Sequence, residues 1–260
     1  NTELFDRSNQ ASDMVSKEMY TFQDKGGDNL SLRPEGTASC VRACIDNDLI
    51  RTDSPRLWYN GPMFRYERPQ KGRSRQFHQS SVEVFGMDGP EIDAEIILLS
   101  SRLWKALGID RDLYLEINSL GSEETRQDYI EALVKFFKPL EGRLDEDSKR
   151  KLEENPLRIL DSKSENIINL LQQAPKITDF LDEDSALHFK SLLNLLDDSG
   201  VEYTINSNLV RGLDYYNKTV FEWKTKNLGS QDTVCGGGRY DSLVEELGGK
   251  TCPAIGFSMG

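Results

Sequence analysis

Residues 61–86 constrain the fold of this chain more than any other stretch. Leu57-Trp58-Tyr59 leads into a first expected strand, and Val82-Glu83-Val84-Phe85 closes a second one. Between them lies a loop rich in Arg, Lys and Gly, with a proline that would interrupt a central strand. The pattern predicts two antiparallel strands joined by a basic loop.

This loop is cationic although the chain as a whole carries a formal net charge of −12. A solvated hairpin tip is one interpretation. The other is a polyphosphate site, because guanidinium groups bind phosphate oxygens bidentately. Arg65 and Glu67 lie two residues apart on one strand, so a cation and a carboxylate would share a face. The cations are Arg65, Arg68, Lys71, Arg73 and Arg75.

The totals exclude several classes of protein. With 37% hydrophobic and 29% charged residues, the 260-residue chain is typical of a globular protein and not of a disordered one. No apolar run reaches membrane-spanning length, and no signal-peptide pattern opens the chain. The negative net charge argues against a broad nucleic-acid surface, although it permits a local basic groove. The four cysteines form no Cys-x-x-Cys pair, so we expect free thiols, a cytoplasmic protein and no metal site.

The basic hairpin carries a family resemblance. Phe64-Arg65-Tyr66-Glu67, the basic loop and the antiparallel return strand resemble motif 2 of the class II aminoacyl-tRNA synthetases. The continuation through Arg68-Pro69-Gln70-Lys71-Gly72-Arg73 and Gln76-Phe77-His78-Gln79 is similar specifically to histidyl-tRNA synthetases. The resemblance implies a histidine-tRNA ligase, which activates L-histidine with ATP and transfers it to tRNA(His).

Further stretches agree with the same family. Arg33-Pro34-Glu35-Gly36-Thr37 matches the family pattern that holds the α-amino group of the amino acid. The string from Leu209 to Asn217 is either a turn with paired tyrosines or, by the resemblance, the signature peptide that sets this family apart from other class II enzymes. Val234-Cys235-Gly236-Gly237-Gly238-Arg239-Tyr240-Asp241 is similar to a third signature, in which glycines permit a close backbone approach or a strained turn. Residues 253–260 resemble the opening of motif 3. Most of motif 1 and the end of motif 3 are missing, so we expect a core truncated at both ends that is weakly active in isolation.

The expected architecture is α+β, with an antiparallel sheet flanked by helices. The catalytic domain is expected to comprise residues 1–121 and 201–260. The composition changes in residues 122–200, which are rich in charged residues and contain recurrent Leu and Ile. This predicts a helical insertion. Its role is either bulk or, by the resemblance, proximity to the tRNA acceptor stem. Pro90 to Leu107 predicts a long helix with Gly108 as its stop, and its expected buried positions are Ile92, Ile96, Leu99, Leu103 and Leu107.

The resemblance implies an ATP site built on positive charge. Joining a carboxylate to the α-phosphate accumulates negative charge at phosphorus, so fixed cations matter more than proton transfer. Arg65 and Arg211 are the expected catalytic residues, and Arg211 would stand where other class II enzymes use a divalent ion. Mg²⁺ would accompany the outer phosphates. The residues expected to bind ATP are Arg65, Glu67, Arg73, Arg75 and Phe77.

Histidine selection poses a separate requirement. A neutral imidazole offers one N–H donor and one acceptor, so the pocket needs an acceptor and a donor. By the resemblance, Glu83 supplies the acceptor and the Tyr216 hydroxyl the donor. Glu35 and Thr37 would bind the ammonium group, although helix capping is their alternative role. The expected histidine-binding residues are Glu35, Thr37, Gln79, Glu83, Arg211, Tyr215, Tyr216 and Tyr240.

One departure from the family pattern concerns the strand after the basic loop. The family usually has Leu-Gly where this chain has Ser80-Ser81. Because Gln79, Ser81 and Glu83 share a face, the Ser81 side chain is expected to crowd the pocket or to hydrogen-bond within it.

Two competing functions remain at this point. A non-catalytic relative could bind histidine as a regulatory subunit of histidine biosynthesis, and a pseudo-synthetase domain could bind uncharged tRNA as a signalling module. The joint presence of Arg65, Glu67 and Arg211 argues against both, because neither needs an α-phosphate clamp. The expected partners are therefore L-histidine, ATP and tRNA(His), with a homodimer in the full-length protein and no membrane.

Overall fold

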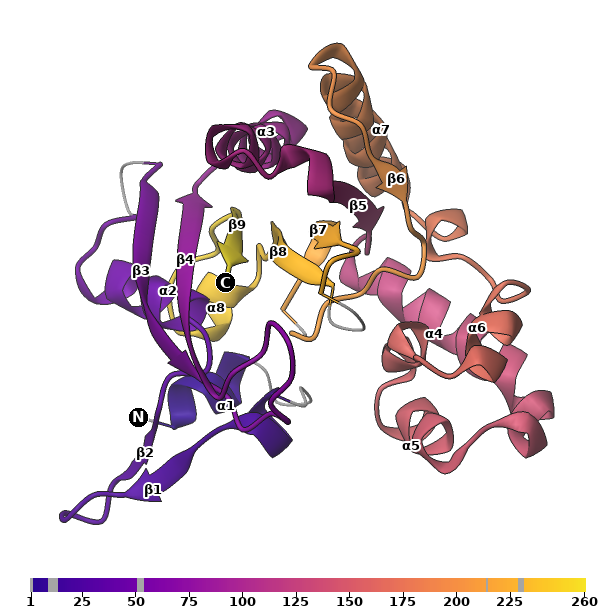
Figure 1. Cartoon of the computed structure of the whole chain (residues 1–260), viewed down its shortest axis with the longest axis horizontal. Coiled ribbons are helices and arrows are strands. Elements are labelled where there is room, and N and C mark those ends of the chain that lie inside the picture. Colours follow the sequence, from indigo (N-terminus) through magenta and orange to yellow (C-terminus); the bar gives the residue numbers. More distant parts are fainter. Residues whose placement is uncertain (1, 9–13, 51–53, 214, 229–231) are drawn as a thin grey trace.

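The computed structural model describes residues 2–8, 14–50, 54–213, 215–228 and 232–260 (Figure 1). Within these residues, seven strands form one sheet: β3 (Arg56–Phe64), β4 (Gln76–Phe85), β5 (Leu113–Ser119), β6 (Thr204–Ile205), β7 (Asn217–Thr225), β8 (Thr233–Arg239) and β9 (Ala254–Met259). Their order is β3-β4-β9-β8-β7-β5-β6. Neighbours are antiparallel except for the parallel pair β5–β6, so the expected α+β class is confirmed.

The β3–β4 hairpin follows the sequence prediction. Its register pairs Tyr59 with Ser81 and Gly61 with Gln79. Successive side chains of β4 point to opposite faces of the sheet, so Val84 and Phe85 enter different hydrophobic clusters. Every second residue of β4 therefore lies on the same face of the sheet. Gln79, Ser81 and Glu83 share the face that carries the candidate site.

Helices cover both faces of the sheet (Figure 1). On one face, α3 (Pro90–Leu107) and α7 (Glu183–Asp198) pack over apolar side chains of β5, β7 and β9. On the other face, α2 (Thr37–Asp46) and the short α8 (Leu243–Glu246) pack near Phe85 and Tyr240. The site residues on β4 thus face α2.

The predicted limits of α3 are confirmed. Pro90 occupies the first turn, where its missing N–H costs nothing, and Gly108 ends the helix in the left-handed conformation with φ of 70°. The predicted buried stripe is wrong at Leu99 and Leu107, which are 44% and 58% exposed. The second half of the helix turns Trp104 into the core instead, where its ring contacts Trp223 edge-on.

The N-terminal segment packs against α2, where Leu4 and Phe5 share a hydrophobic cluster with Ala38. It contains α1 (Glu3–Ser8), a π-helix (Met14–Glu18) and a two-stranded antiparallel sheet of β1 (Thr21–Gln23) and β2 (Asn29–Ser31). Met19 to Phe22 and Leu30 to Arg33 have the sequence pattern of two strands around a glycine turn, and the structure forms this hairpin, with Gly27 at φ of 92°.

Residues 122–200 contain the predicted helices. They are α4 (Glu123–Phe137), α5 (Glu146–Glu154), α6 (Glu165–Leu171) and α7, with 3₁₀ segments at Lys138–Arg143, Pro156–Asp161 and Ile177–Asp179; a further 3₁₀ turn, Asp110–Asp112, precedes β5. Helices α4 to α6 lie to one side of the sheet (Figure 1), whereas α7 packs on α3. We propose that the inserted unit comprises α4 to α6 and that α7 belongs to the layer over the sheet.

Two local predictions differ from the structure. The sequence of residues 201–205 predicts a five-residue strand, but the structure has a strand only at Thr204–Ile205. Gly236, Gly237 and Gly238 lie inside β8 and not in a turn. A Cβ on Gly237 would collide with the backbone carbonyl of Gly256 on β9, so the close backbone approach is made to a neighbouring strand.

A buried polar cluster joins α3, α7, β7 and β8. Asp93 is fully buried and accepts hydrogen bonds from Thr219 Oγ1 at 2.6 Å and from the Arg239 guanidinium. His188 Nε2 lies 2.8 Å from Asp93 Oδ2. Burial raises the pKa of Asp93, but His188 and Arg239 more than offset this and lower it overall. The cluster holds the layers of the fold together behind the candidate site.

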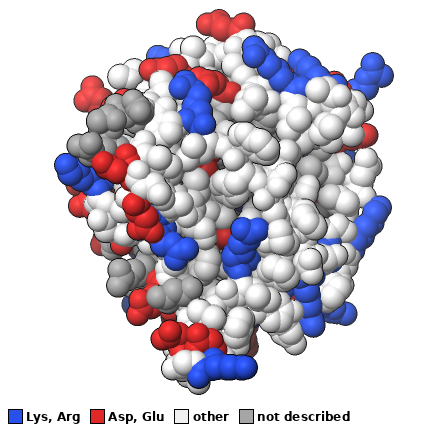
Figure 2. Space-filling view, turned by 90° about the vertical axis from the view of Figure 1, so that its left-hand side faces the viewer, with Lys and Arg blue, Asp and Glu red and all other residues white. Residues whose placement is uncertain are grey.

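Charged side chains are dispersed on the face that carries β3. Figure 2 shows Lys and Arg side chains standing apart there, with Asp and Glu side chains among them. Within the described residues, this face offers no broad basic surface. No helix in the described part of the chain is long and apolar enough to cross a membrane. The four cysteines all lie in described segments and are free thiols.

Candidate active site

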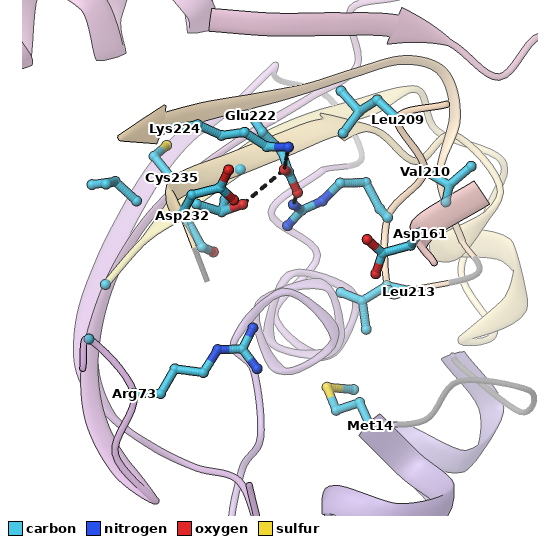
Figure 3. A pocket seen from close by; sticks show the side chains of 18 of the residues that line it. Met14, Arg73, Asp161, Leu209, Val210, Leu213, Glu222, Lys224, Asp232 and Cys235 are labelled. Atoms are coloured by element: carbon cyan, nitrogen blue, oxygen red, sulfur yellow. Dashed lines mark hydrogen bonds and ion pairs between the residues drawn. The ribbon is translucent and has the colours of Figure 1, made fainter. Parts of the chain in front are cut away.

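A cavity of about 650 Å³ opens between the basic hairpin, the 206–213 segment and the β7–β8 strands. Figure 3 shows Arg73 on one wall and Glu222 with Lys224 on another. Asp161, from the end of a 3₁₀ segment in the insertion, lies on a third wall. The sheet and the helical insertion therefore both contribute to one cavity.

The first wall carries the basic hairpin residues. Arg65 Nε donates to the carbonyl oxygen of Pro34 at 2.8 Å, and its guanidinium lies 5.3 Å from the ring centroid of Phe77. Arg73 Nη1 lies 2.6 Å from Glu67 Oε2. Burial lowers the pKa of Arg65. Two guanidinium groups and a carboxylate thus line the same hollow, which suits a polyanionic ligand with a polar ring.

Arg75 takes a different position. Its guanidinium stacks 4.1 Å from the ring centroid of Tyr66, and its Nε donates to the carbonyl oxygen of Glu67 at 3.2 Å. It does not line this cavity, unlike the other residues expected to bind ATP. Arg75 is exposed to solvent.

Gln79 lines the cavity and has an unsatisfied atom. Within the described residues, its Oε1 is buried and accepts no hydrogen bond. An unpaired buried acceptor costs free energy, and a ligand N–H donor would remove that cost. The side chain therefore suits an ammonium group.

Arg211 stands on the opposite wall, where Glu222 on β7 pairs with its Nη1. Its Nε is buried and has no acceptor within the described residues. Burial lowers the pKa of Arg211, but Glu222 and the nearby tyrosines raise it overall. The guanidinium therefore stays charged and retains a donor. Asp214, in the same motif, lies outside the described residues.

Glu83 is buried and lies at the centre of a second group of residues. Its Oε1 accepts from Thr37 Oγ1 and from the Tyr59 hydroxyl, both at 2.8 Å, and its Oε2 accepts from the Tyr240 hydroxyl at 2.6 Å. Burial raises the pKa of Glu83 to about 7, against the effect of these hydrogen bonds. Three of about four acceptor positions on the carboxylate are therefore occupied.

Glu35 performs the alternative role foreseen for it. Its carboxylate accepts from the backbone N–H groups of Thr37 at 2.5 Å and Ala38 at 3.0 Å, and so caps the N-terminus of α2. Burial raises its pKa against these hydrogen bonds and the charge of Arg65. Capping fixes the Thr37 hydroxyl on Glu83, so Glu35 supports this group whether or not it contacts a ligand.

Two adjacent tyrosines complete the buried group. The rings of Tyr215 and Tyr216 lie 4.8 Å apart, and the Tyr215 ring lies 5.6 Å from that of Tyr240. The guanidinium of Arg211 lies 5.9 Å from the Tyr216 ring. The buried group therefore adjoins the cavity through Arg211.

Apart from Arg75, the structure divides the expected site residues into two sets. The cavity is lined by Arg65, Glu67, Arg73, Phe77, Gln79 and Arg211. The buried group behind it contains Glu35, Thr37, Glu83, Tyr215, Tyr216 and Tyr240. These six residues contact one another and do not line the cavity.

Ser81 explains how the departure from the family pattern is accommodated. Its hydroxyl lies 2.7 Å from Ser258 Oγ on β9, directly across the β4–β9 register, and it is also a partner of the Tyr59 hydroxyl. Ser258 lines the cavity, whereas Ser81 is buried. The extra hydroxyl is therefore satisfied between two strands.

Sequence reasoning missed three residues of the site. Tyr59 and Glu222 each form a hydrogen bond or ion pair with an expected site residue, and Lys224 reaches Glu222. Tyr59 lies on β3, and Glu222 and Lys224 lie two residues apart on β7. The sequence shows that these residues lie in strand-like stretches, but it does not show which strands are their neighbours in the sheet.

Comparisons with known proteins give a consistent result. A sequence model of the histidyl-tRNA synthetase family matches residues 2–260. The crystal structure of an apo histidyl-tRNA synthetase from S. aureus is 40% identical, has a TM-score of 0.76, and is matched over 99% of this chain and 60% of that chain. This chain therefore spans about 60% of that relative's length.

Two further structures share the fold at lower identity. One, described as an ATP phosphoribosyltransferase regulatory subunit/histidyl-tRNA synthetase from Bacillus halodurans, is 21% identical with a TM-score of 0.66, over 98% of this chain and 69% of that chain. The other, a histidine–tRNA ligase subunit from Alicyclobacillus acidocaldarius, is 22% identical with a TM-score of 0.63, over 99% and 81%.

Proposed function

This chain belongs to the histidyl-tRNA synthetase family, and we propose that its cavity activates L-histidine with ATP and passes the histidyl group to tRNA(His). In the first step, a carboxylate oxygen of histidine forms a bond to the α-phosphorus of ATP, and the bond to the bridging oxygen breaks. The products are histidyl-adenylate and pyrophosphate. The observation that carries this proposal is that Arg65 and Arg211 line one cavity from two walls.

The two arginines suit the electrostatic demand of this step. Negative charge increases on the oxygens around the α-phosphorus, and fixed cations in a partly buried site stabilise it. Arg65 is held by the Pro34 carbonyl and Arg211 by Glu222, so both guanidinium groups are oriented in advance. Neither has to gain or lose a proton.

The remaining hairpin residues suit the nucleotide. Phe77 offers an aromatic face beside Arg65, and Glu67 and Arg73 offer an acceptor and a donor pair. Arg75, which is exposed, would add positive charge to the loop. Within the described residues, no group of three or more His, Cys, Asp or Glu is arranged to hold a metal ion. We propose that Mg²⁺ enters on the β- and γ-phosphates of ATP.

The histidine end of the substrate would meet both sets of residues. Gln79 Oε1, with Glu35 and Thr37, suits the ammonium group. Glu83 Oε2 carries one hydroxyl partner and keeps one acceptor position, which suits an imidazole N–H. Tyr216 would donate to the bare ring nitrogen, and Tyr215 and Tyr240 would enclose the ring. Because the six side chains of the buried group contact one another and are buried from solvent, histidine entry requires them to separate.

The proposed function also implies a tRNA partner, an oligomeric state and a cellular location. The inserted helices α4 to α6 would lie near the acceptor stem of tRNA(His), since Asp161 of this unit already lines the cavity. We also propose a homodimer for the full-length protein and a cytoplasmic location. The regulatory alternative is disfavoured, because a histidine sensor has no use for paired arginines around an α-phosphate.

Binding of a non-reactive adenylate analogue tests this proposal. Histidyl-sulfamoyl-adenosine, in which a sulfamate replaces the phosphate, should bind this chain at least about 10²-fold more tightly than the phenylalanyl analogue, because the latter leaves Glu83 and Tyr216 without partners. Calorimetric titration measures both. Equal affinities would contradict histidine selection, and no binding of either would contradict the adenylate site.

A further inference from the structure

Four charged side chains form a row in which positive and negative charges alternate: Arg211, Glu222, Lys224 and Glu116. Glu116 on β5 and Glu222 on β7 are direct cross-strand partners, an arrangement of like charges that is destabilising by itself. Lys224 Nζ lies between them, 3.0 Å from Glu116 Oε2 and 3.4 Å from Glu222 Oε2. Glu222 Oε1 then pairs with Arg211.

The same two glutamates hold both ends of the 206–211 segment. Asn206 Nδ2 donates to Glu116 Oε2 at 2.8 Å, and Arg211 pairs with Glu222. Thr233 Oγ1 donates to Glu222 Oε2 at 2.9 Å, so Lys224 and Thr233 occupy one carboxylate oxygen and leave the other for Arg211. Figure 3 shows Glu222 and Lys224 together on the cavity wall.

The side chains concerned are largely removed from solvent, so screening by salt is weak. The exposed fractions are 14% for the Lys224 side chain and 16% for that of Glu116. Burial lowers the pKa of Lys224, but Glu222 and Glu116 raise it overall, and Asp232 adds to this effect. Burial raises the pKa of Glu222, but Arg211 and Lys224 lower it overall.

We propose that Lys224 is a positioning residue for the reaction: it neutralises the opposed pair Glu116 and Glu222 and so directs Glu222 Oε1 to Arg211. In this role Lys224 acts on the α-phosphate through Arg211. The proposal rests on the proposed function only for its kinetic consequence. The arrangement of the four charges also fixes the Arg211 guanidinium, and this effect can be measured without an activity assay.

Removing the Lys224 charge tests the proposal. In K224M, Glu116 and Glu222 face each other without the lysine between them, and Arg211 remains as the counter-ion of Glu222 alone. The kcat for histidine-dependent ATP–pyrophosphate exchange should therefore fall about tenfold while KM for histidine stays within about twofold. The double variant E116Q/K224M removes the repulsion and keeps an acceptor for Asn206. It should recover most of kcat, as should K224R. K226M, at an exposed lysine two residues away, is the matched control.

A spectroscopic measurement separates this proposal from the proposed function. The Arg211 Nε–H signal in a ¹⁵N–¹H spectrum, assigned by its loss in R211K, should be sharp in the wild type and in K226M, broadened in K224M and sharp again in E116Q/K224M. Unchanged kcat and an unchanged signal in K224M would overturn the positioning role. The same holds for a double variant that recovers neither. Absence of exchange in the wild type with this spectral pattern intact would overturn the proposed function alone.

Discussion

The guanidinium of Arg211 occupies space that is open only because residue 236 is glycine. A Cβ on Gly236 would lie 2.5 Å from Arg211 Nη1 and 2.7 Å from Cζ. These atoms are the far end of a flexible side chain, so the protein can accommodate a methyl group there by moving the guanidinium. Gly236 therefore controls the position of the charge and contributes little to the folding of β8 by comparison.

The substitution G236A should accordingly lower the exchange rate on the order of 10²-fold while the protein remains folded, because a displaced guanidinium no longer stabilises the charge at phosphorus. Exchange kinetics and circular dichroism measure the two effects. G142A is the control, since no atom lies within 4 Å of a Cβ at that position. Normal exchange in G236A would show that the Arg211 position is unimportant.

Glu83 should make the stability of the protein depend on pH. Its folded-state pKa is raised from 4.5 to about 7, so the folded protein holds a proton between these values that the unfolded chain releases. The contribution is full below pH 4.5 and is lost as pH rises through 7. Between pH 5.5 and 8 the loss is roughly 2 kcal/mol of unfolding free energy.

The variant E83Q mimics the protonated side chain and should not show this loss. In urea unfolding at several pH values, its free energy of unfolding should improve relative to the wild type as pH increases. E131Q, at an exposed position of α4, should run parallel to the wild type. Parallel curves for E83Q as well would contradict a raised pKa at Glu83.

Arg73 and Arg75 should differ in their effects on ATP. Arg73 lines the cavity and pairs with Glu67, whereas Arg75 stacks on Tyr66. R73A should raise KM for ATP about tenfold, the loss of one charge-assisted contact, and R75A less than about threefold. Steady-state exchange at varied ATP measures both. A larger effect of R75A would mean that the loop rearranges when ATP binds.

The Ser81 hydroxyl should contribute to stability more than to catalysis. S81A leaves Ser258 Oγ without its 2.7 Å partner and should cost about 1 kcal/mol in urea unfolding, with histidine kinetics unchanged within about twofold. S80A, one residue earlier in β4, is the matched control. A large change in KM for histidine in S81A would instead place Ser81 in substrate selection.

Local sequence patterns predicted the elements of the fold well. Proline at residue 90 and glycine at residue 108 defined α3, and the alternation of β4 put Ser81 and Glu83 on one face. The exposure of Leu99 and Leu107 was not predictable, because the helical period cannot tell which of two adjacent stripes meets the sheet.

Contacts between distant strands could not be predicted from the sequence. The pairing of β4 with β9 brings Ser81 to Ser258, and the pairing of β5 with β7 sets Glu116 against Glu222. These contacts depend on strand order, which no local pattern encodes. For the same reason, Tyr59 and Lys224 were missed, although Tyr59 lies in the stretch that leads into the first expected strand.

Amino-acid-dependent exchange of pyrophosphate into ATP tests the central claim most directly. With this chain and each of the twenty amino acids in turn, exchange should depend on L-histidine, at least about 10²-fold above any other, because only its ring nitrogens satisfy the buried donors and acceptors. R65A and R211A should abolish it. Histidine binding without exchange, or equal exchange with another amino acid, would contradict the account.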